Sequence, residues 1–422
     1  MIQFPIKKKI KINDKAIYFY RQTLWVWLFL YYNLFMSIIN TFKTSDDLYK
    51  AYPKTKYFTL KDIFSDFWYD FLEYADNHDL TFRNVVKVDV ERMMLCKTVH
   101  LGCSTYRCPE CNNTLRVFNT CKSRFCNSCG VKYAKQRTLN IESKLISGTH
   151  RHLVFTISDI LWPLFLEDRK RLNFMFEAVS KTLLSWYKEK YKDKNLTPGF
   201  ILTLHTFGRD DKWNVHIHCL LSEFALGNTG EKKMDFIPFD MLRKRFQKIL
   251  LDLLENDIGK SKFRPIKNKI YSKYNNGFYV RAKKNEFPNS KKAISYILRY
   301  CGRPCFAQYR IIDIDEDNFI SFWYQRHEDD LFVVERIHIF EFIARLIRHI
   351  PDRNFKTIRY YGFYASKKHK LYDACKKLID KAKLPFYRSL TKWRNLLITS
   401  FNIAPLKCPN CGTIMDFVYA FT

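Results

Sequence analysis

The sequence is short of acidic residues. Its 422 residues include 42 Asp and Glu against 72 Lys and Arg, which gives a formal net charge of +30. This balance favours a polyanionic partner, because each phosphate that a cation neutralises releases a condensed counterion. Charge alone leaves two alternatives open: a merely basic soluble surface, and attraction to the acidic surface of a membrane.

Internal repeats and low-complexity linkers are also absent. The hydrophobic content of 47% and the aromatic content of 17% are those of a packed globular protein, which excludes an intrinsically disordered chain. The length suits two or three domains and at least one sizeable core.

The chain lacks an uninterrupted membrane-spanning segment. Residues 24–39 (LWVWLFLYYNLFMSII) are strongly apolar and follow a run of lysines at 7–9. They fall short of the about 20 residues that a spanning helix needs, and Asn33 interrupts them. No small-residue cleavage site is present. The segment is a signal anchor, a buried or interfacial helix, or residues upstream of a true start at Met36; we expect no stable membrane association.

Cysteine, by contrast, is plentiful and arranged in pairs. The 13 cysteines include three Cys-x-x-Cys pairs, at Cys108 and Cys111, Cys126 and Cys129, and Cys408 and Cys411. Two thiolates at this spacing can reach one tetrahedral ion. The pattern therefore favours metal binding over disulfides, and with it a reducing, cytoplasmic compartment.

A short basic connection separates the first two pairs, which predicts one structural zinc ion held by Cys108, Cys111, Cys126 and Cys129. Four thiolates leave no open position for a substrate. A second zinc set would consist of Cys96, Cys121, Cys408 and Cys411, which would bring the C-terminus back onto this module. Basic side chains here form a candidate phosphate-contacting surface, or else a solvated charged face: Lys122, Arg124, Lys132, Lys135 and Arg137.

The order of elements from residue 148 onward indicates an α+β fold. Strands are expected at 152–158, 200–207, 215–221 and 277–282, and helices at 162–192, 236–256 and 290–301. The two middle strands are close enough in sequence for an antiparallel hairpin. The order suits an antiparallel sheet on the split βαβ plan, with helices on one face.

Four regions follow from these patterns. We expect an unassigned apolar and basic segment at 1–59 and a mostly helical and zinc-binding module at 60–147. The α+β core occupies 148–305, and a C-terminal extension with a further Cys-x-x-Cys half-site occupies 306–422.

Two histidines, His216 and His218, lie inside an apolar strand. Alternate residues of a strand point to the same face, so the two imidazoles project together. Neutral imidazoles side by side are a ready divalent-metal site; the alternative is a pair of structural core histidines. His205, on the preceding strand, is a candidate third ligand or a partner that orients a ligand.

Two tyrosines, Tyr296 and Tyr300, share one face of the last predicted helix. Aromatic residues at this spacing are most often core, and with 26 tyrosines in the chain coincidence is common. A phenol with a pKa of about 10 needs a base or nearby positive charge to act as a nucleophile. Arg299, Arg303 and Lys292 are placed to supply that charge.

Taken together, a hydrophobic-flanked His-x-His and a following helix with Tyr-x-x-x-Tyr resemble the HUH single-strand endonucleases. The upstream cysteine-rich stretch 96–129 is similar to the transposase zinc-binding domain. With 204–208 (LHTFG), 215–219 (VHIHC) and 360–364 (YYGFY), the chain resembles the two-tyrosine rolling-circle transposases of the IS91 insertion-sequence family over residues 60–415. It departs from the family in its first 50 residues, and at Asn214, where the family commonly carries proline.

This resemblance implies an HUH nuclease core that holds Mg²⁺ or Mn²⁺ through the two histidines, beside one or two structural Zn²⁺ ions. It implies that tyrosine attacks a DNA phosphate to form a covalent 5′-phosphotyrosine, so that the strand end is kept for rejoining. The implied partners are single-stranded DNA at the ends of a mobile element and target DNA, with no small-molecule substrate. The implied setting is the nucleoid of a prokaryotic cell.

Two other functions are open at this point. A non-catalytic zinc-dependent DNA-binding protein would keep the zinc and the DNA but make no covalent link; the presence of both histidines and both tyrosines disfavours it. A replication-initiation or mobilisation nuclease would apply the same chemistry to another DNA, and the zinc module with its C-terminal Cys-x-x-Cys favours the transposase instead.

Overall fold

A computed structural model describes residues 38–53, 56–146, 148–191, 196–227, 230–234, 236–282, 305–326, 328–365, 371, 375, 379 and 383–421. They form two compact units. The smaller contains the described residues up to Phe58 together with Tyr309–Ile343, and the larger contains Thr59–Gln308 and Ala344–Thr422. The expected C-terminal extension is thus divided between the units, whereas the segments expected as zinc module and α+β core lie within the larger one.

Within its described residues, the smaller unit is a four-stranded antiparallel sheet of order β1-β11-β10-β9 with a helix against it. Its elements are β1 (Ile38–Phe42), α2 (Ser45–Ala51), β9 (Ile311–Ile314), β10 (Phe319–Gln325) and β11 (Phe332–His338). Leu48 of α2 packs on Ile312 and Val334 to form its core. Helix α11 (Ile339–Ile347) follows β11 directly and crosses the boundary between the units in sequence.

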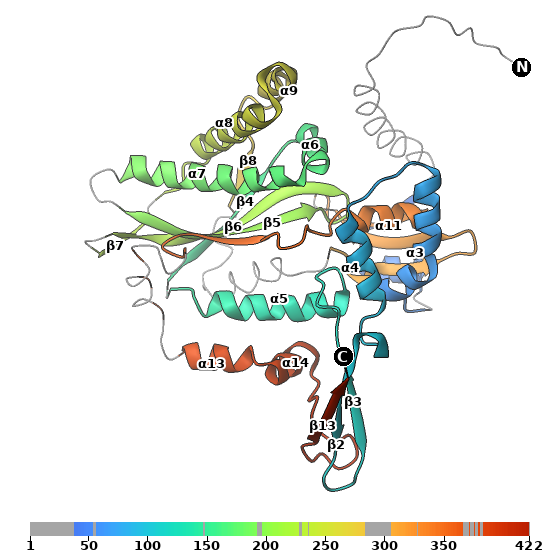
Figure 1. Ribbon diagram of the computed structural model, residues 1–422. Coiled ribbons are helices and arrows are strands. Elements are labelled where there is room, and N and C mark those ends of the chain that lie inside the picture. The colour runs from blue at the N-terminus through green and yellow to red at the C-terminus, as the bar shows by residue number, and fades with distance from the viewer. Residues whose placement is uncertain are drawn as a thin grey trace, which may run out of the picture. The chain divides into compact units, whose positions relative to one another are not determined.

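The larger unit is built on a second antiparallel sheet, of order β12-β5-β6-β4-β8, with β7 paired to β6 (Figure 1). Its strands are β4 (His150–Thr156), β5 (Thr197–Phe207), β6 (Trp213–Gly227), β7 (Gly230–Lys233), β8 (Tyr279–Arg281) and β12 (Ile358–Gly362). Its helices are α6 (Trp162–Glu167), α7 (Leu172–Lys190), α8 (Phe239–Ile258) and α9 (Lys260–Lys273). The expected α+β class with antiparallel pairing is confirmed, and so is the hairpin, now β5–β6.

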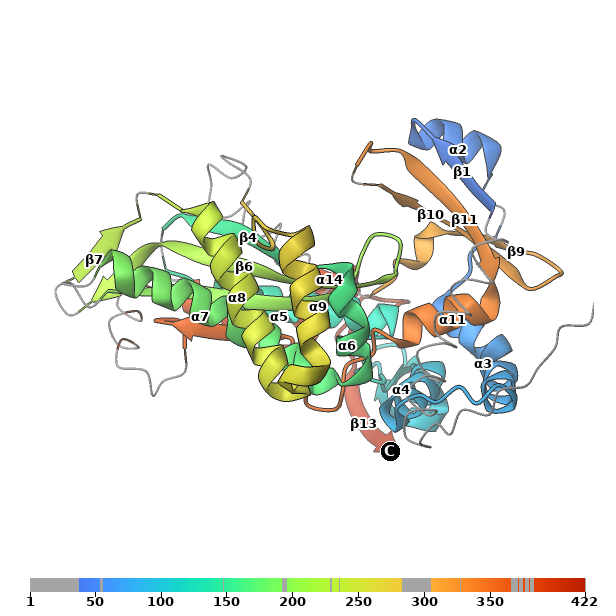
Figure 2. The same cartoon turned by 90° about the horizontal axis from the view of Figure 1, so that it is seen from above.

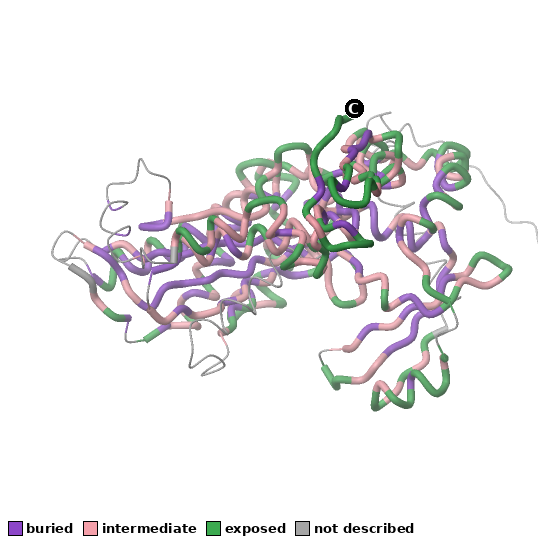
Figure 3. Tube along the Cα trace, turned by 90° about the horizontal axis from the view of Figure 1, so that it is seen from below, coloured by how far each residue is buried: buried purple, intermediate pink, exposed green. Residues whose placement is uncertain are grey.

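Two helices bury one face of this sheet. Met175 of α7 and Phe246 of α8 belong to the same buried cluster as Leu202 and Ile217 from the strands. Figure 2 shows α8 and α9 running across the strands. Burial of this apolar surface is the main driving force for the unit. Figure 3 shows buried residues following the central strands.

The expectation of helices on one face is only partly right, because the opposite face is covered too. Ile141 of α5 (Asn127–Glu142) packs there with Leu145, and both contact the cluster of Ile201 and Leu220. By strand alternation this is the face that also carries the histidines of β5 and β6.

The N-terminal part of the larger unit begins with two helices, in keeping with the mostly helical segment expected there. Helix α3 (Leu60–Asn77) begins with a capping box of Thr59 and Asp62 and buries Trp68, and α4 (Asn84–Met94) follows it. A small sheet of order β13-β2-β3 comes next. The remaining elements are β2 (Cys103–Arg107), β3 (Thr114–Phe118), α13 (Lys383–Leu390), α14 (Trp393–Phe401), β13 (Asp416–Phe421) and the 3-10 turns Val99–Leu101, Asp159–Leu161, Arg169–Arg171 and Gln308–Arg310.

Two expected features lie outside the described residues. The helix with Tyr296 and Tyr300, together with Lys292, Arg299 and Arg303, falls within 283–304, and most of the apolar segment falls within 1–37. In the part of the chain that the structure describes, no helix has the length and apolar character needed to cross a membrane.

Candidate metal centres

Three histidines meet on the β5–β6 hairpin. His205 of β5 lies directly opposite His216 of β6, and His218 follows two residues later on the same face. One ring nitrogen from each of the three lies within 4.8 Å of the others. Val215 and Ile217 alternate with the histidines and are fully buried in the core on the other face. The strand pattern therefore produces the expected cluster, with His205 included.

The hydrogen bonds of these rings show which nitrogen is available. His216 Nδ1 lies 3.1 Å from the backbone oxygen of Asn214, and because a carbonyl only accepts, Nδ1 donates and Nε2 keeps its lone pair. Burial lowers the pKa of His216 to about 4. Burial, reinforced by the neighbouring histidines, also lowers the pKa of His218 well below its ordinary value. Both rings are thus neutral at pH 7, as metal ligands must be.

A fourth histidine, His152 of β4, was not singled out from the sequence. Its Nε2 lies 2.8 Å from Nδ1 of His218, and the two rings stack at a centroid distance of 5.1 Å. The contact engages Nδ1 of His218, so Nε2 is the nitrogen with which His218 would bind a metal ion. A signal was present: His150 and His152 alternate on a strand just as His216 and His218 do.

The cysteines form two four-thiol groups, but not the two expected. Cys108 and Cys111 are not brought together with Cys126 and Cys129. One group is Cys96, Cys121, Cys126 and Cys129, and the other is Cys108, Cys111, Cys408 and Cys411. The C-terminal pair does return to the N-terminal module, yet it joins the first Cys-x-x-Cys pair. All described cysteines are free thiols.

Both groups have the spacing of a tetrahedral zinc site. Zinc–sulfur bonds of about 2.3 Å place the thiolates of a tetrahedral site about 3.8 Å apart. In the buried group, sulfur–sulfur distances of 3.6 to 3.8 Å join Cys96 to Cys126 and Cys129, and Cys121 to Cys129. In the other group they are 3.4 to 3.7 Å. Each donor set therefore fits a structural Zn²⁺.

The β2–β3 hairpin explains the grouping. Cys108 and Cys111 sit at its turn, and Cys96 and Cys121 flank its base, where the Lys97 N–H donates to the Asn119 carbonyl oxygen at 3.0 Å. Five-residue strands separate turn and base by about 15 Å. The two Cys-x-x-Cys pairs adjacent in sequence are thus held apart, and β13 pairs with β2 to bring the C-terminal pair to the turn.

The two pairs at the turn share one backbone form. The Cys108 N–H donates to Asn113 O, and the Cys408 N–H donates to Thr413 O, both at 2.8 Å. Asn112 and Gly412, which directly follow the second cysteine of each pair, both have positive φ, 57° and 77°. Asn and Gly are the residues that adopt this conformation most readily, so the local sequence favours two matching metal knuckles.

Of the basic residues expected to contact phosphate, five are described. Lys132, Lys135 and Arg137 lie on α5, and Lys122 and Arg124 precede it. The guanidinium groups of Arg124 and Arg137 both lie over the Tyr133 ring, at 5.2 and 4.9 Å from its centroid. Helix α5 covers the histidine face of the sheet, so this basic segment and the histidine site belong to the same side of the unit.

This arrangement defines an α+β metalloprotein that combines two thiol sites with a histidine site. A model of a family described as "Putative transposase" matches residues 199–370, and one of a "Transposase zinc-binding domain" matches residues 63–157. The chain is 26% identical over 383 residues to the transposase for insertion sequence element IS801 of Pseudomonas savastanoi pv. phaseolicola, covering 86% of this chain and 90% of that one. It is 25% identical over 291 residues to "Putative transposase y4qJ" of Sinorhizobium fredii (strain NBRC 101917 / NGR234), covering 65% and 73%.

These matches identify the class as insertion-sequence transposases. More particularly, the chain belongs to the IS91 family of transposases and carries that family's N-terminal zinc-binding domain. No solved structure matches it.

Proposed function

We propose that this transposase cleaves and rejoins single-stranded DNA through a covalent 5′-phosphotyrosine, with a divalent metal ion bound by His205, His216 and His218. The observation that carries the proposal is the convergence of three buried or half-buried imidazoles on one sheet face. Core histidines without a metal rarely need three ring nitrogens directed at one point.

The histidines have a defined chemical task. A divalent ion held there, Mg²⁺ or Mn²⁺, would supply positive charge to neutralise and orient a scissile phosphate. His216 and His218 would hold that ion through Nε2, because their Nδ1 atoms are engaged by Asn214 and His152. Imidazole ligands favour Mn²⁺ over Mg²⁺, which prefers oxygen.

The tyrosines complete the reaction. The phenol oxygen of Tyr296 or Tyr300 attacks phosphorus, the bond to the 3′-oxygen breaks, and the phenol proton ends on the released 3′-hydroxyl. The ester keeps the energy of the phosphodiester, so rejoining needs no nucleotide cofactor. Two tyrosines permit two successive cleavages with one strand end held while the other is attacked.

DNA binding is proposed for the zinc module as well. The relatives are named as transposases, and the basic side chains on and before α5 lie on the same side of the sheet as the histidines. Structural zinc at the two thiol groups would hold this surface in place. A single strand that follows α5 would pass the histidine site.

The test is cleavage of single-stranded oligonucleotides that span the ends of the genetic element. Purified full-length protein is assayed with Mn²⁺ or Mg²⁺, and with EDTA. We expect His216→Ala and His218→Ala to lose cleavage by at least a hundredfold while keeping their zinc, and His100→Ala, an exposed histidine outside the cluster, to retain it. Cleavage in EDTA, or wild-type rates in the cluster variants, would refute the proposal.

A further inference from the structure

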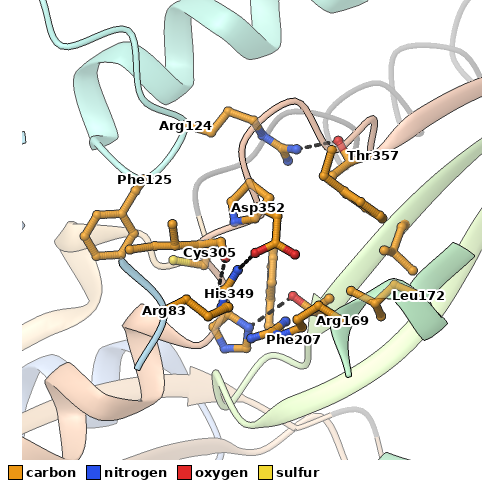
Figure 4. A pocket seen from close by; sticks show the side chains of 15 residues that line it. Arg83, Arg124, Phe125, Arg169, Leu172, Phe207, Cys305, His349, Asp352 and Thr357 are labelled. Carbon is orange, nitrogen blue, oxygen red and sulfur yellow. Dashed lines mark hydrogen bonds and ion pairs between the residues drawn. The ribbon is translucent and has the colours of Figure 1, made fainter. Parts of the chain in front are cut away.

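An arginine-lined pocket lies where β12 stops pairing with β5. The two strands pair from Gly362 with Gly199 to Ile358 with Thr203. Beyond that point the pocket opens beside Thr206 and Phe207 of β5 (Figure 4). Its polar lining consists chiefly of Arg83, Arg124, Arg169, Asp352, His349 and Thr206.

The pocket holds more positive charge than its own carboxylate can balance. Three guanidinium groups line it against the single carboxylate of Asp352, which forms an ion pair with Arg83. Arg169 donates to the backbone oxygen of Arg348 and lies over the Trp213 ring, 4.2 Å from its centroid. No carboxylate among the described residues forms an ion pair with Arg169. Uncompensated charge of this kind is costly away from water.

The one histidine in the pocket adds no charge. His349 Nε2 donates to the backbone oxygen of Asp211 at 2.9 Å, and Nδ1 lies 3.1 Å from the hydroxyl oxygen of Thr206. Burial lowers the pKa of His349 to about 3, so the ring is neutral. Burial, together with nearby Arg83 and Arg348, also lowers the pKa of Arg169 to about 9. With three arginines, one aspartate and a neutral histidine, the pocket lining carries a net positive charge, which suits an anion.

One side chain, Phe207, connects the pocket with the histidine site. Its ring stacks on His205 at a centroid distance of 5.4 Å and an interplanar angle of 9°. The same ring lies 5.3 Å from that of His349. Phe207 thus contacts one ring of the histidine site and one ring of the pocket, so the two sites are neighbours.

The pocket is also assembled from two parts of the sequence. Arg83 and Arg124 belong to the segment matched by the zinc-binding family model, whereas Thr206 and His349 belong to the segment matched by the transposase model. Figure 4 shows Arg124 beside Thr357, and Arg83 and Arg169 near His349 and Asp352. A bound anion would contact both parts.

We propose that this pocket binds one backbone phosphate of the DNA strand, next to the phosphate at the histidine site; the proposal rests on the proposed nuclease function. Guanidinium groups recognise phosphate oxygens through paired N–H donors, and several around one anion fix its position. Such a contact sets the register of the strand and so decides which phosphate reaches the metal.

The test combines a protein variant with a change in the DNA. Full-length, zinc-loaded protein without added Mn²⁺ or Mg²⁺, where we expect no cleavage, is titrated with single-stranded oligonucleotides in which one phosphate at a time is a neutral methylphosphonate. For the wild type we expect one position near the cleavage site to weaken binding about tenfold. Arg169→Gln should bind the unmodified strand about tenfold more weakly and should no longer respond to that position. Arg264→Gln, which removes an exposed charge on α9, should behave as the wild type.

Additive effects of the variant and the methylphosphonate would overturn the proposal, as would the absence of any sensitive position. Should Arg169→Gln lose zinc or unfold, Arg124→Gln takes its place with the same expectation. Sensitivity that appears only with a 5′-phosphorylated oligonucleotide would assign the pocket to a strand end and would also overturn it. Cleavage is measured separately. If the protein showed no nuclease activity but its binding still depended on one phosphate of the oligonucleotide, the proposed function would be refuted and the phosphate-binding pocket would still be supported.

Discussion

His152 Nε2 lies 2.8 Å from Nδ1 of His218, and the two rings are almost parallel, with an interplanar angle of 14°. The contact joins β4 to β6 beneath the candidate metal site. With Nε2 of His218 directed at the metal, Nδ1–H donates to His152, which fixes the tautomer and the angle of the ligand ring. If the histidines bind the proposed metal ion, His152 acts as a positioning residue.

His152→Ala should weaken binding of the catalytic metal about tenfold to a hundredfold, since the ligand ring loses its hydrogen-bond partner. Titration of Mn²⁺ against cleavage rate measures this: the midpoint should move to higher concentration, and saturating Mn²⁺ should restore most of the rate. His100→Ala is the matched control. An unchanged midpoint would contradict the positioning role.

The grouping of the thiols predicts which variants lose the same ion. Native mass spectrometry should find two Zn²⁺ ions per wild-type chain and one in the double variant Cys111→Ser/Cys411→Ser. It should find none in Cys111→Ser/Cys126→Ser, because those cysteines belong to different groups. Cys103→Ser, a buried cysteine in neither group, should keep both ions. If Cys111→Ser/Cys126→Ser kept one ion, the grouping first expected from the sequence would be restored.

Gly362 is required where β12 meets β5. It has φ of +60°, and a Cβ there would lie 1.6 Å from the backbone oxygen of Pro198. Gly362→Ala should therefore lower the free energy of unfolding by more than about 3 kcal/mol. Gly259→Ala has a similar backbone penalty, with φ of +94° and no atom within 4 Å, and should cost only about 1–3 kcal/mol. Urea unfolding of both variants measures the difference, and equal losses would refute the clash.

His150 predicts a pH dependence of stability. Its Nε2 accepts from the Tyr364 hydroxyl at 2.6 Å, its Nδ1 donates to the Gly148 carbonyl at 3.0 Å, and burial lowers its pKa to about 4. As pH falls below the ordinary value of about 6.5, the unfolded chain takes up the proton first, so stability decreases between about 6.5 and about 4, by up to about 3 kcal/mol.

Acid also releases zinc from thiolates, and this loss affects the wild type and His150→Gln alike. The difference in stability between these two proteins therefore isolates the contribution of His150. The wild type should be the more stable protein at pH 7, and its advantage should shrink steadily in urea titrations taken down to pH 4.5. An advantage that stays constant over this range would show that His150 is not the group that titrates.

Local patterns predicted the parts of the site that depend on one hairpin. The alternation of His216 and His218 in an apolar strand, with His205 across a short turn, is enough to place three rings on one face. The cysteine grouping could not be predicted, because spacing shows which thiols are near in sequence and not that the β2–β3 hairpin separates turn from base. Likewise, the pairing of β1 with β11 joins residues nearly 300 positions apart, and no local periodicity indicates it.

The segment Tyr360–Tyr364 illustrates a different limit. It contributed to the family resemblance, yet these contacts of the segment are structural. Tyr361 stacks on Phe200 at a centroid distance of 5.2 Å, and the missing side chain of Gly362 lets the Pro198 backbone approach closely. The Tyr364 hydroxyl forms a hydrogen bond with His150. A motif can mark a family through packing as well as through chemistry.

The most direct test of the central claim is covalent capture. Full-length protein is mixed with single-stranded oligonucleotides from the ends of its element and Mn²⁺, then separated by denaturing electrophoresis. We expect a DNA-linked protein band that disappears with EDTA and in Tyr296→Phe/Tyr300→Phe. It should persist in Tyr309→Phe, which changes an exposed tyrosine of the smaller unit. Tight binding without any linked band, or a band that survives the double substitution, would contradict it.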